Sequence, residues 1–286
     1  MAALRQDELR RLAARYDSEL ATLERRYLRE LLGELRVARA AIHDRLLQAD
    51  IAAYETWRLT ALEADIDRVI AAAQWRVVRA VQDHVARSAA TGDRYAVAAL
   101  GLGGTVAGSF GVVNAGALAH LVSYQYGLIR GITDQVRSDI KRQLIQGVLQ
   151  GDSIPKIAQR LVKGTGLERG VWPTVETRAE VIARTETIRA YAQAARWQYR
   201  QYGVKRGLWL TGRDERVCEQ CAPLDGQLFP IDALPGGGPP LHPQCRCMVA
   251  PDIAESEDES RARDDEAAAN FKQAQERLKP KKGARK

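Results

Sequence analysis

The sequence is poor in several residue types, and each scarcity excludes a class of protein. Aromatic residues make up 6% of the 286 residues, methionine occurs twice, and all four cysteines lie between positions 218 and 247. Cysteines confined to one segment exclude a disulfide-rich scaffold; since the N-terminus shows no apolar leader, they indicate metal or redox chemistry. With 45% hydrophobic and 28% charged residues, the composition also excludes wholesale disorder and collagen.

Charge is missing from one long stretch. Between Tyr95 and Ile129 the sequence contains no Asp, Glu, Lys or Arg. This length would suit a membrane span, which needs about 20 apolar residues, but Asn114 and His120 are costly in lipid and the glycines weaken a helix. We therefore expect close helix packing or a glycine-rich hinge. No Gly-Lys-Ser/Thr follows these glycines, so they do not form a phosphate-binding loop.

Basic residues outnumber acidic ones, which gives a formal net charge of +7 and a pI of about 9.3. The excess is concentrated between Arg130 and Arg213, where 16 basic residues accompany 7 acidic ones. This balance permits contact with nucleic acid or another anionic surface without requiring it.

Apolar residues at helical spacing predict long helices. They recur every three or four positions from Leu9 to Leu35, and again from Ile51 to Val85. Such a stripe must be buried, either in a bundle of this chain or in a self-associating arm. Further helices are expected from Ile132 to Val148, after Ser153, and from Thr174 to Gly203.

The last of these helices contains Arg189, Arg196 and Arg200 at spacings that place them on one stripe, with aromatic residues nearby. Arginines interleaved with aromatic residues suit nucleic-acid phosphates and bases. They equally suit a solvated helix flank whose arginine stems cover the core. The sequence is compatible with both interpretations.

The segment 207–251 contains every cysteine, in the order C-x2-C, twenty residues, H-x2-C-x-C. A thiolate pair two residues apart on a tight turn can bind one side of a tetrahedral zinc ion. Five side chains compete for four positions: Cys218, Cys221, His242, Cys245 and Cys247. We prefer Cys218, Cys221 and Cys245 as three of the zinc ligands, with His242 or Cys247 as the fourth. Cys247 is the weaker choice, because two cysteines in a C-x-C spacing bind one ion less readily than two in C-x2-C. We expect structural zinc; disulfides and metal-free thiols are the alternatives, and no neighbouring general base indicates catalytic zinc.

The same segment has strand and turn signals. Trp209 and Leu210 are expected to form a strand, and Asp225–Gly226 is a turn signal before Phe229. We therefore expect a small β-ribbon held closed by metal.

Three segments, ARTETIRAYAQAA, WLTGRDERVCEQCAPLDGQLF and PPLHPQCRC, resemble the phage Mu F-like head morphogenesis family of minor head proteins. The resemblance covers about residues 128–251. It implies an architectural role for the motif residues Arg184, Thr185, Glu186, Asp214, Arg216, Asp225, Gly226 and Arg246, and for the four cysteines and His242. One hypothesis is that Glu186 pairs with a nearby arginine and orients its helix against the ribbon.

With this resemblance, we expect a mainly α fold in which an N-terminal helical bundle or arm and long helices lead into a small α+β module with a cysteine-rich β-ribbon. The expected domains are a helical arm or bundle at 1–94, an uncharged connecting segment at 95–127, the Mu F-like domain at 128–252 and a charged tail at 253–286. We expect this tail to be a mobile arm or a frayed helix.

The resemblance implies a minor capsid protein of a tailed phage or prophage, without enzymatic activity, in the capsid interior and in the host cytoplasm during assembly. Its implied partners are the portal protein, capsid or scaffold proteins and nonspecifically bound packaged DNA; a membrane is not an expected partner. Two alternatives are an ADP-ribosyltransferase-like effector and a zinc-ribbon nucleic-acid-binding regulator. A regulator should bind DNA with sequence preference. A capsid protein should bind DNA without sequence preference and with a steep dependence on salt, because it contacts phosphates alone.

Overall fold

The structure is a computed structural model that describes residues 2–48, 56–102, 115–150, 152, 156, 171–212, 214–252 and 257–279. Two compact units divide the chain. Unit 1 comprises residues 1–23, 85–119 and 184–286, and unit 2 comprises residues 24–84 and 120–183.

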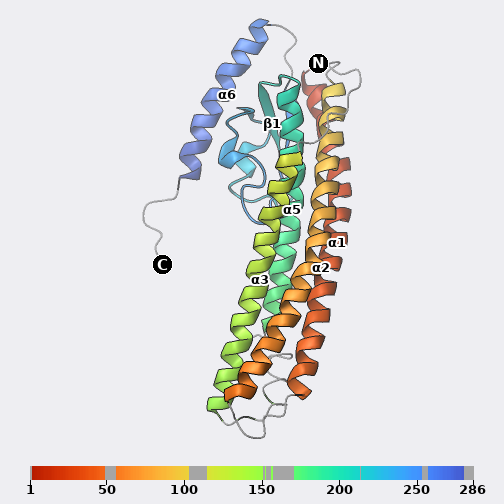
Figure 1. The fold of residues 1–286 in the computed structure, drawn as a ribbon. Helices are drawn as coiled ribbons and strands as arrows, with labels where there is room; N and C mark the ends of the chain where they lie inside the picture. Colours follow the sequence, from red (N-terminus) through yellow and green to blue (C-terminus); the bar gives the residue numbers. More distant parts are fainter. Residues whose placement is uncertain are drawn as a thin grey trace. The chain divides into compact units, whose positions relative to one another are not determined.

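Long helices dominate the described residues, as Figure 1 shows. They are α1 (Ala2–Gln48), α2 (Thr56–Gly101), α3 (Ala115–Leu149), α5 (Val171–Gln201) and α6 (Glu257–Leu278). The mainly α prediction is confirmed, and α5 begins three residues before the expected Thr174. None of the described helices contains a segment apolar enough to cross a bilayer. The helix expected after Ser153 lies outside the described residues.

The core of unit 2 consists of aliphatic side chains from α1, α2, α3 and α5. Among its buried residues are Leu31, Leu35, Ile66, Val77, Val81, Ile129, Ile140 and Ile182. Within this core, the rings of Tyr27 and His84 stack with centroids 3.9 Å apart. Burial lowers the pKa of His84 to about 3, so the imidazole is neutral at physiological pH.

Unit 1 contains the small sheet, in the order β2-β1-β3 with both pairs antiparallel. Its strands are β1 (Arg206–Leu210), β2 (Leu228–Pro230) and β3 (Met248–Asp252). The expected strand at Trp209 is confirmed. Trp209 and Phe229 pack edge to face within the core of unit 1, with ring centroids 6.1 Å apart. The turn at Asp225–Gly226 precedes β2, but the connection from β1 is a long loop and not a two-residue hairpin.

Glycine at position 92 allows α2 and α5 to approach closely within unit 1. A Cβ atom at Gly92 would lie 2.1 Å from the carbonyl oxygen of Tyr191. Beside this crossing, Tyr95 is fully buried with its ring 5.4 Å from that of Tyr191. The start of the uncharged stretch therefore packs against α5, in keeping with the expected close helix packing.

The charged tail includes the ordered helix α6, which packs on β2 within unit 1. The side chain of Asn270 donates a hydrogen bond to the carbonyl of Leu228 at 3.1 Å. Arg206 is 3% exposed; it donates to Asp252 at 2.8 Å and to the Ser260 carbonyl at 3.0 Å, and it pairs with Asp264. A buried guanidinium thus joins β1, β3 and α6.

Candidate metal centre

Two loops of unit 1 supply the five candidate ligands. Cys218 and Cys221 precede the short 3-10 helix η1 (Ala222–Leu224), and His242, Cys245 and Cys247 precede β3. The first loop turns tightly, because the Cys221 N–H donates to the Cys218 carbonyl at 3.1 Å. In the second loop, the Cys245 N–H donates to the His242 carbonyl at 3.2 Å.

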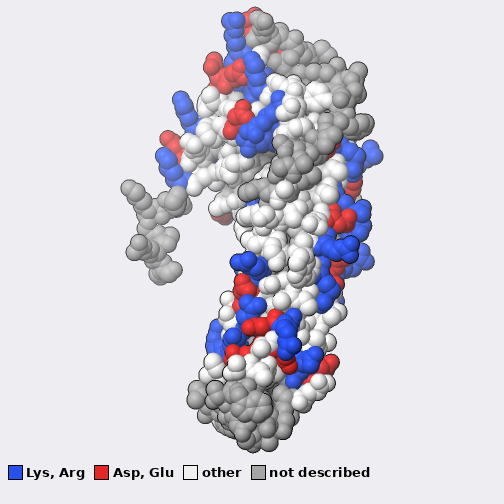
Figure 2. Space-filling view, viewed as in Figure 1, with Lys and Arg blue, Asp and Glu red and all other residues white. Residues whose placement is uncertain are grey.

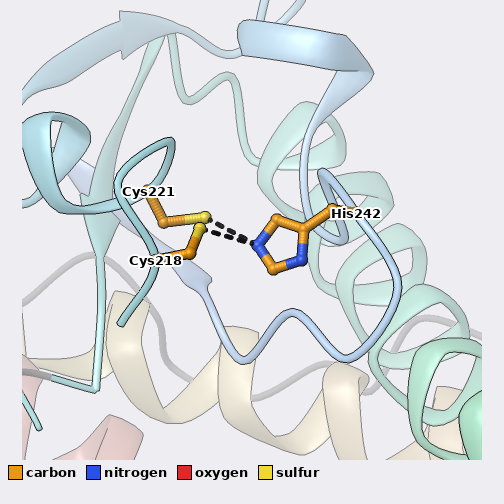
Figure 3. Close-up of side chains that lie close together, drawn as sticks. All are labelled: Cys218, Cys221 and His242. Carbon is orange, nitrogen blue, oxygen red and sulfur yellow. Dashed lines mark hydrogen bonds between the residues drawn. The ribbon is translucent and has the colours of Figure 1, made fainter. Parts of the chain in front are cut away.

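The structure brings these side chains together in two groups that share Cys221. In the first group, the sulfur atoms of Cys218 and Cys221 lie 3.1 and 3.2 Å from Nε2 of His242, and all three point toward one another (Figure 3). In the second group, Cys221, Cys245 and Cys247 are buried, and the sulfurs of Cys221 and Cys245 are 4.0 Å apart. Within each group the ligand atoms lie within 4.8 Å of one another, so each group could hold a metal ion.

The second nitrogen of His242 explains how the ring is directed at the cysteines. Nδ1 lies 2.8 Å from the carbonyl oxygen of Pro243, the adjacent residue. When Nδ1–H donates to this carbonyl, Nε2 retains its lone pair and points at the two sulfurs. Metal-binding histidines are commonly oriented by such a hydrogen bond from the non-coordinating nitrogen.

Hydrogen bonding among the buried thiols separates their pKa values. The hydrogen bond with Cys245 is the main cause that raises the pKa of Cys221. Hydrogen bonds with Cys221 and Cys247 lower the pKa of Cys245 to about 2. Hydrogen bonding thus makes Cys245 easier to deprotonate than Cys221, and the thiolate is the form of cysteine that binds zinc.

The motif A-R-T-E on α5 contacts the second ligand loop. The backbone N–H of Gln244 donates to Oγ1 of Thr185 at 3.1 Å, and Nη1 of Arg184 lies 3.5 Å from Oε1 of Gln244. Gln244 has a left-handed backbone, with φ of 63°, between His242 and Cys245. Thr185 thus stabilises the strained residue between two candidate ligands.

Glu186 is buried and pairs with Arg189 at 2.9 Å, three residues along the same helix. Burial raises the pKa of Glu186, and the charge of Arg189 opposes this shift. The hypothesis of a pair with a nearby arginine therefore agrees with the geometry, but Arg184 and Thr185 are the motif residues that contact the ligand loop.

Asp214 holds the start of the first ligand loop. Its carboxylate pairs with Arg246, which lies between Cys245 and Cys247, and it accepts the backbone N–H of Arg216 at 3.1 Å. The hydrogen bond with Arg246 lowers the pKa of Asp214 to about 2. Asp214 therefore links the two loops that supply the candidate ligands.

Asp225 connects the end of this loop to β1 and to α1. It accepts the backbone N–H of Thr211 at 2.9 Å and pairs with both terminal nitrogens of Arg10, at 3.1 and 3.0 Å. Gly226 follows with φ of +75°, a conformation that favours glycine. Sequence reasoning missed Arg10 and Gln244, because neither residue lies near its partner along the chain.

The three arginines of the α5 stripe all have partners within unit 1. Arg189 pairs with Glu186, and Arg200 pairs with Asp232 at 2.7 Å. Arg196 donates to the carbonyls of Gly237 and Asp232, at 2.9 and 3.0 Å. These contacts favour the interpretation of the stripe as a helix flank that fastens the loop at 232–237.

Comparisons with known proteins locate a family domain over this part of the chain. Residues 138–250 match the family described as Phage Mu protein F like protein. A protein of Haemophilus influenzae (strain ATCC 51907 / DSM 11121 / KW20 / Rd), described as uncharacterized, is 29% identical over 134 residues. That match covers 46% of this chain and 28% of the relative, so the similarity spans less than a third of the relative's length. No solved structure matches the chain.

Proposed function

Because residues 138–250 match the family described as Phage Mu protein F like protein, we propose that this protein is a minor capsid protein acting in head morphogenesis of a tailed phage or prophage. The family match is the observation that carries the proposal. The contacts of the motif residues support it. Thr185, Asp214 and Asp225 use their polar groups to hold loops of unit 1, as an architectural module requires.

The cysteine cluster completes this module as a structural metal centre. Zinc would be held by Cys218, Cys221, His242 and Cys245, with Cys247 as the alternative ligand. Sulfur and imidazole donors in a largely buried site suit a closed tetrahedral ion, which contributes folding energy and supplies no catalytic water. The ion would fasten the two loops that flank η1 and β3.

The protein acts with other head components during procapsid assembly. Its partners are the portal protein and the capsid or scaffold proteins, and its final location is the capsid interior. There it contacts packaged DNA through phosphates, without sequence preference.

Mass spectrometry of gradient-purified procapsids and mature particles tests this function. The expected result is recovery of its peptides at a few copies per particle, because a minor head component is not a lattice protein. Immunoprecipitation of the full chain from assembling cells should also recover the portal protein. Absence from both particle types would contradict the proposal and favour the enzyme or regulator alternative.

A further inference from the structure

Among the charged residues of unit 2, most of those that are exposed are basic. Among its described residues, twelve exposed side chains are basic: Arg25, Arg26, Arg29, Arg36, Arg45, Arg68, Arg76, Arg79, Arg130, Arg142, Lys156 and Arg178. Two exposed residues, Asp44 and Glu180, are acidic, and the side chains of Glu30, Asp67, Asp83 and Asp134 are partly accessible. On the face drawn in Figure 2, basic side chains follow α1 along one edge, with acidic side chains between some of them.

Many acidic residues of unit 2 pair with basic residues on the same helix or on a neighbouring helix. Half-buried Glu34 pairs with Arg76, and half-buried Glu63 pairs with Lys141 at 3.3 Å. Asp67 likewise pairs with Arg137 at 2.6 Å. Unit 2 as a whole contains 19 basic and 16 acidic residues, so pairing of its carboxylates leaves an excess of basic groups that can attract an anion.

The outward arginines form regular stripes on two adjacent helices. Arg25, Arg29 and Arg36 are separated by four and seven residues, so they share one face of α1. At a rise of about 1.5 Å per residue, this stripe is about 16 Å long, the length of about five base pairs of DNA at 3.4 Å each. On α2, Arg68 and Arg79 flank Trp75, whose side chain is 77% exposed.

We propose that the helical surface of unit 2, centred on the arginine stripes of α1 and α2, binds the phosphate backbone of DNA. This inference rests on the proposed function, which places the protein beside packaged DNA. Exposed arginines at helical intervals suit phosphates that recur along a duplex. An acidic protein partner is less suited, because protein interfaces have a well-packed apolar centre and the exposed apolar side chains here, such as Val37, Trp75 and Ile145, are scattered.

This surface is distinct from the arginine stripe of α5. Arg196 and Arg200 bind backbone and carboxylate oxygens of unit 1 and are already engaged. By contrast, Arg29 and Arg79 form no ion pair with any residue that the structure describes. Phosphate binding at α1 and α2 would therefore not require breaking an internal contact of these two side chains.

Fluorescence anisotropy with the full chain and a labelled duplex of arbitrary sequence tests the proposal. Affinity is measured from 50 to 300 mM salt for the wild type and for Arg29→Gln, Arg36→Gln and Arg79→Gln combined. The control combines Lys205→Gln, Lys272→Gln and Arg277→Gln, which remove the same charge from exposed positions of unit 1 outside α1 and α2. Circular dichroism verifies that all three proteins are folded.

The unit 2 variant should bind at least about 10-fold more weakly at 100 mM salt, with a salt slope smaller by about 2 to 3, because each lost phosphate contact removes about 0.9 from the slope. The control should change affinity by less than about 3-fold, since its charges do not belong to the stripes of α1 and α2 and contribute only a screened, long-range attraction. Equal losses in both variants, or no loss in the unit 2 variant, would overturn the proposal. If poly-glutamate competes as effectively as unlabelled DNA, the ligand of this surface would be an acidic polypeptide and not DNA.

A third variant separates this inference from the proposed function. If Arg189→Gln, Arg196→Gln and Arg200→Gln combined abolish binding while the unit 2 variant does not, the protein contacts DNA through α5 and the present proposal fails alone. If the wild type fails to bind at 50 mM salt, DNA contact fails altogether. Recovery of the protein in particles is independent of all these results.

Discussion

Unit 1 and unit 2 use charge in opposite ways. Among described residues, unit 1 has eleven exposed basic and eleven exposed acidic residues, whereas unit 2 has twelve and two. Unit 1 also buries a guanidinium, Arg206, and gathers its cysteines in one cluster. Unit 2 is built on aliphatic packing and directs its arginines outward. Within one chain, polar groups therefore form internal contacts in unit 1, whereas the arginines of unit 2 face the surface.

Loss of the shared cysteine should have the largest effect and should be confined to unit 1. Cys221→Ser removes a ligand from both groups, so bound zinc should be lost and the ribbon destabilised by more than about 4 kcal/mol. Metal content per chain and hydrogen exchange at β1 measure this, with α1 at residues 24–48 as the internal reference.

Two further variants define the ligand set. Cys218→Ser should also release the metal, whereas Cys247→Ser should retain it if Cys245 is the fourth ligand. The metal centre would be contradicted if the wild-type protein contains no metal and its melting profile does not change when a chelator is added.

Arg206→Ala should destabilise unit 1 by about 3 to 5 kcal/mol, because it leaves the carboxylate of Asp252 buried with one partner fewer. Denaturant unfolding measures the change, and exchange should rise in α6. Arg200→Ala provides a matched control: its pair with Asp232 is exposed, and its loss should cost less than about 1 kcal/mol. Equal costs would mean that Arg206 is not a structural connection.

Acid should destabilise unit 2 through His84. Its folded pKa of about 3 lies below the ordinary value of 6.5, so the unfolded chain binds the proton more readily. The stability that the neutral ring contributes is complete above pH 6.5 and is lost as pH falls toward 3. Between pH 6.5 and 5 the loss should be about 2 kcal/mol, at 1.36 kcal/mol per unit.

His84→Phe retains an aromatic ring beside Tyr27 and removes the titration. Exchange at residues 60–84 should then depend less on pH between 7 and 5 than in the wild type. If hydrogen exchange depends on pH in the same way in both proteins, groups other than His84 cause the acid sensitivity of unit 2.

The smallest expected effect concerns the exposed aromatic residue of unit 2. Trp75→Ala should reduce affinity for single-stranded DNA by about 1 kcal/mol, because one base loses a stacking partner. Its salt slope should not change, since no charge is removed. The measurement is anisotropy with a labelled oligonucleotide, and Trp197→Ala is the control on α5. A changed slope would show that Trp75 positions arginines instead.

Local patterns predicted most of the fold. Apolar spacing placed the long helices, and the signals around Trp209 placed β1. The cluster of candidate ligands was predictable because the C-x2-C and H-x2-C-x-C spacings already limit each half to one loop. By contrast, Arg10 with Asp225 and Thr185 with Gln244 are far apart in sequence, and no local propensity encodes such pairs.

The surface of unit 2 was not predictable from charge counts. Residues 24–84 contain ten arginines and ten acidic residues, a formal balance of zero. The structure shows eight exposed arginines and one exposed aspartate in the described part of this range. The difference arises because the carboxylates of Asp67 and Glu63 face neighbouring helices, and sequence position alone does not reveal which charges face inward.

The contact between Asn270 and Leu228 has a consequence for how copies of this protein can coexist. The backbone bonds of Gln227 and Ile231 to β1 direct the polar groups of Leu228 and Pro230 to the open side of β2. Proline offers no N–H there, and the carbonyl of Leu228 is occupied by Asn270. An uncovered strand edge is a template on which further chains can polymerise. The tail helix α6 therefore covers this edge of the sheet, so that β2 offers little free backbone for pairing with a strand of another copy.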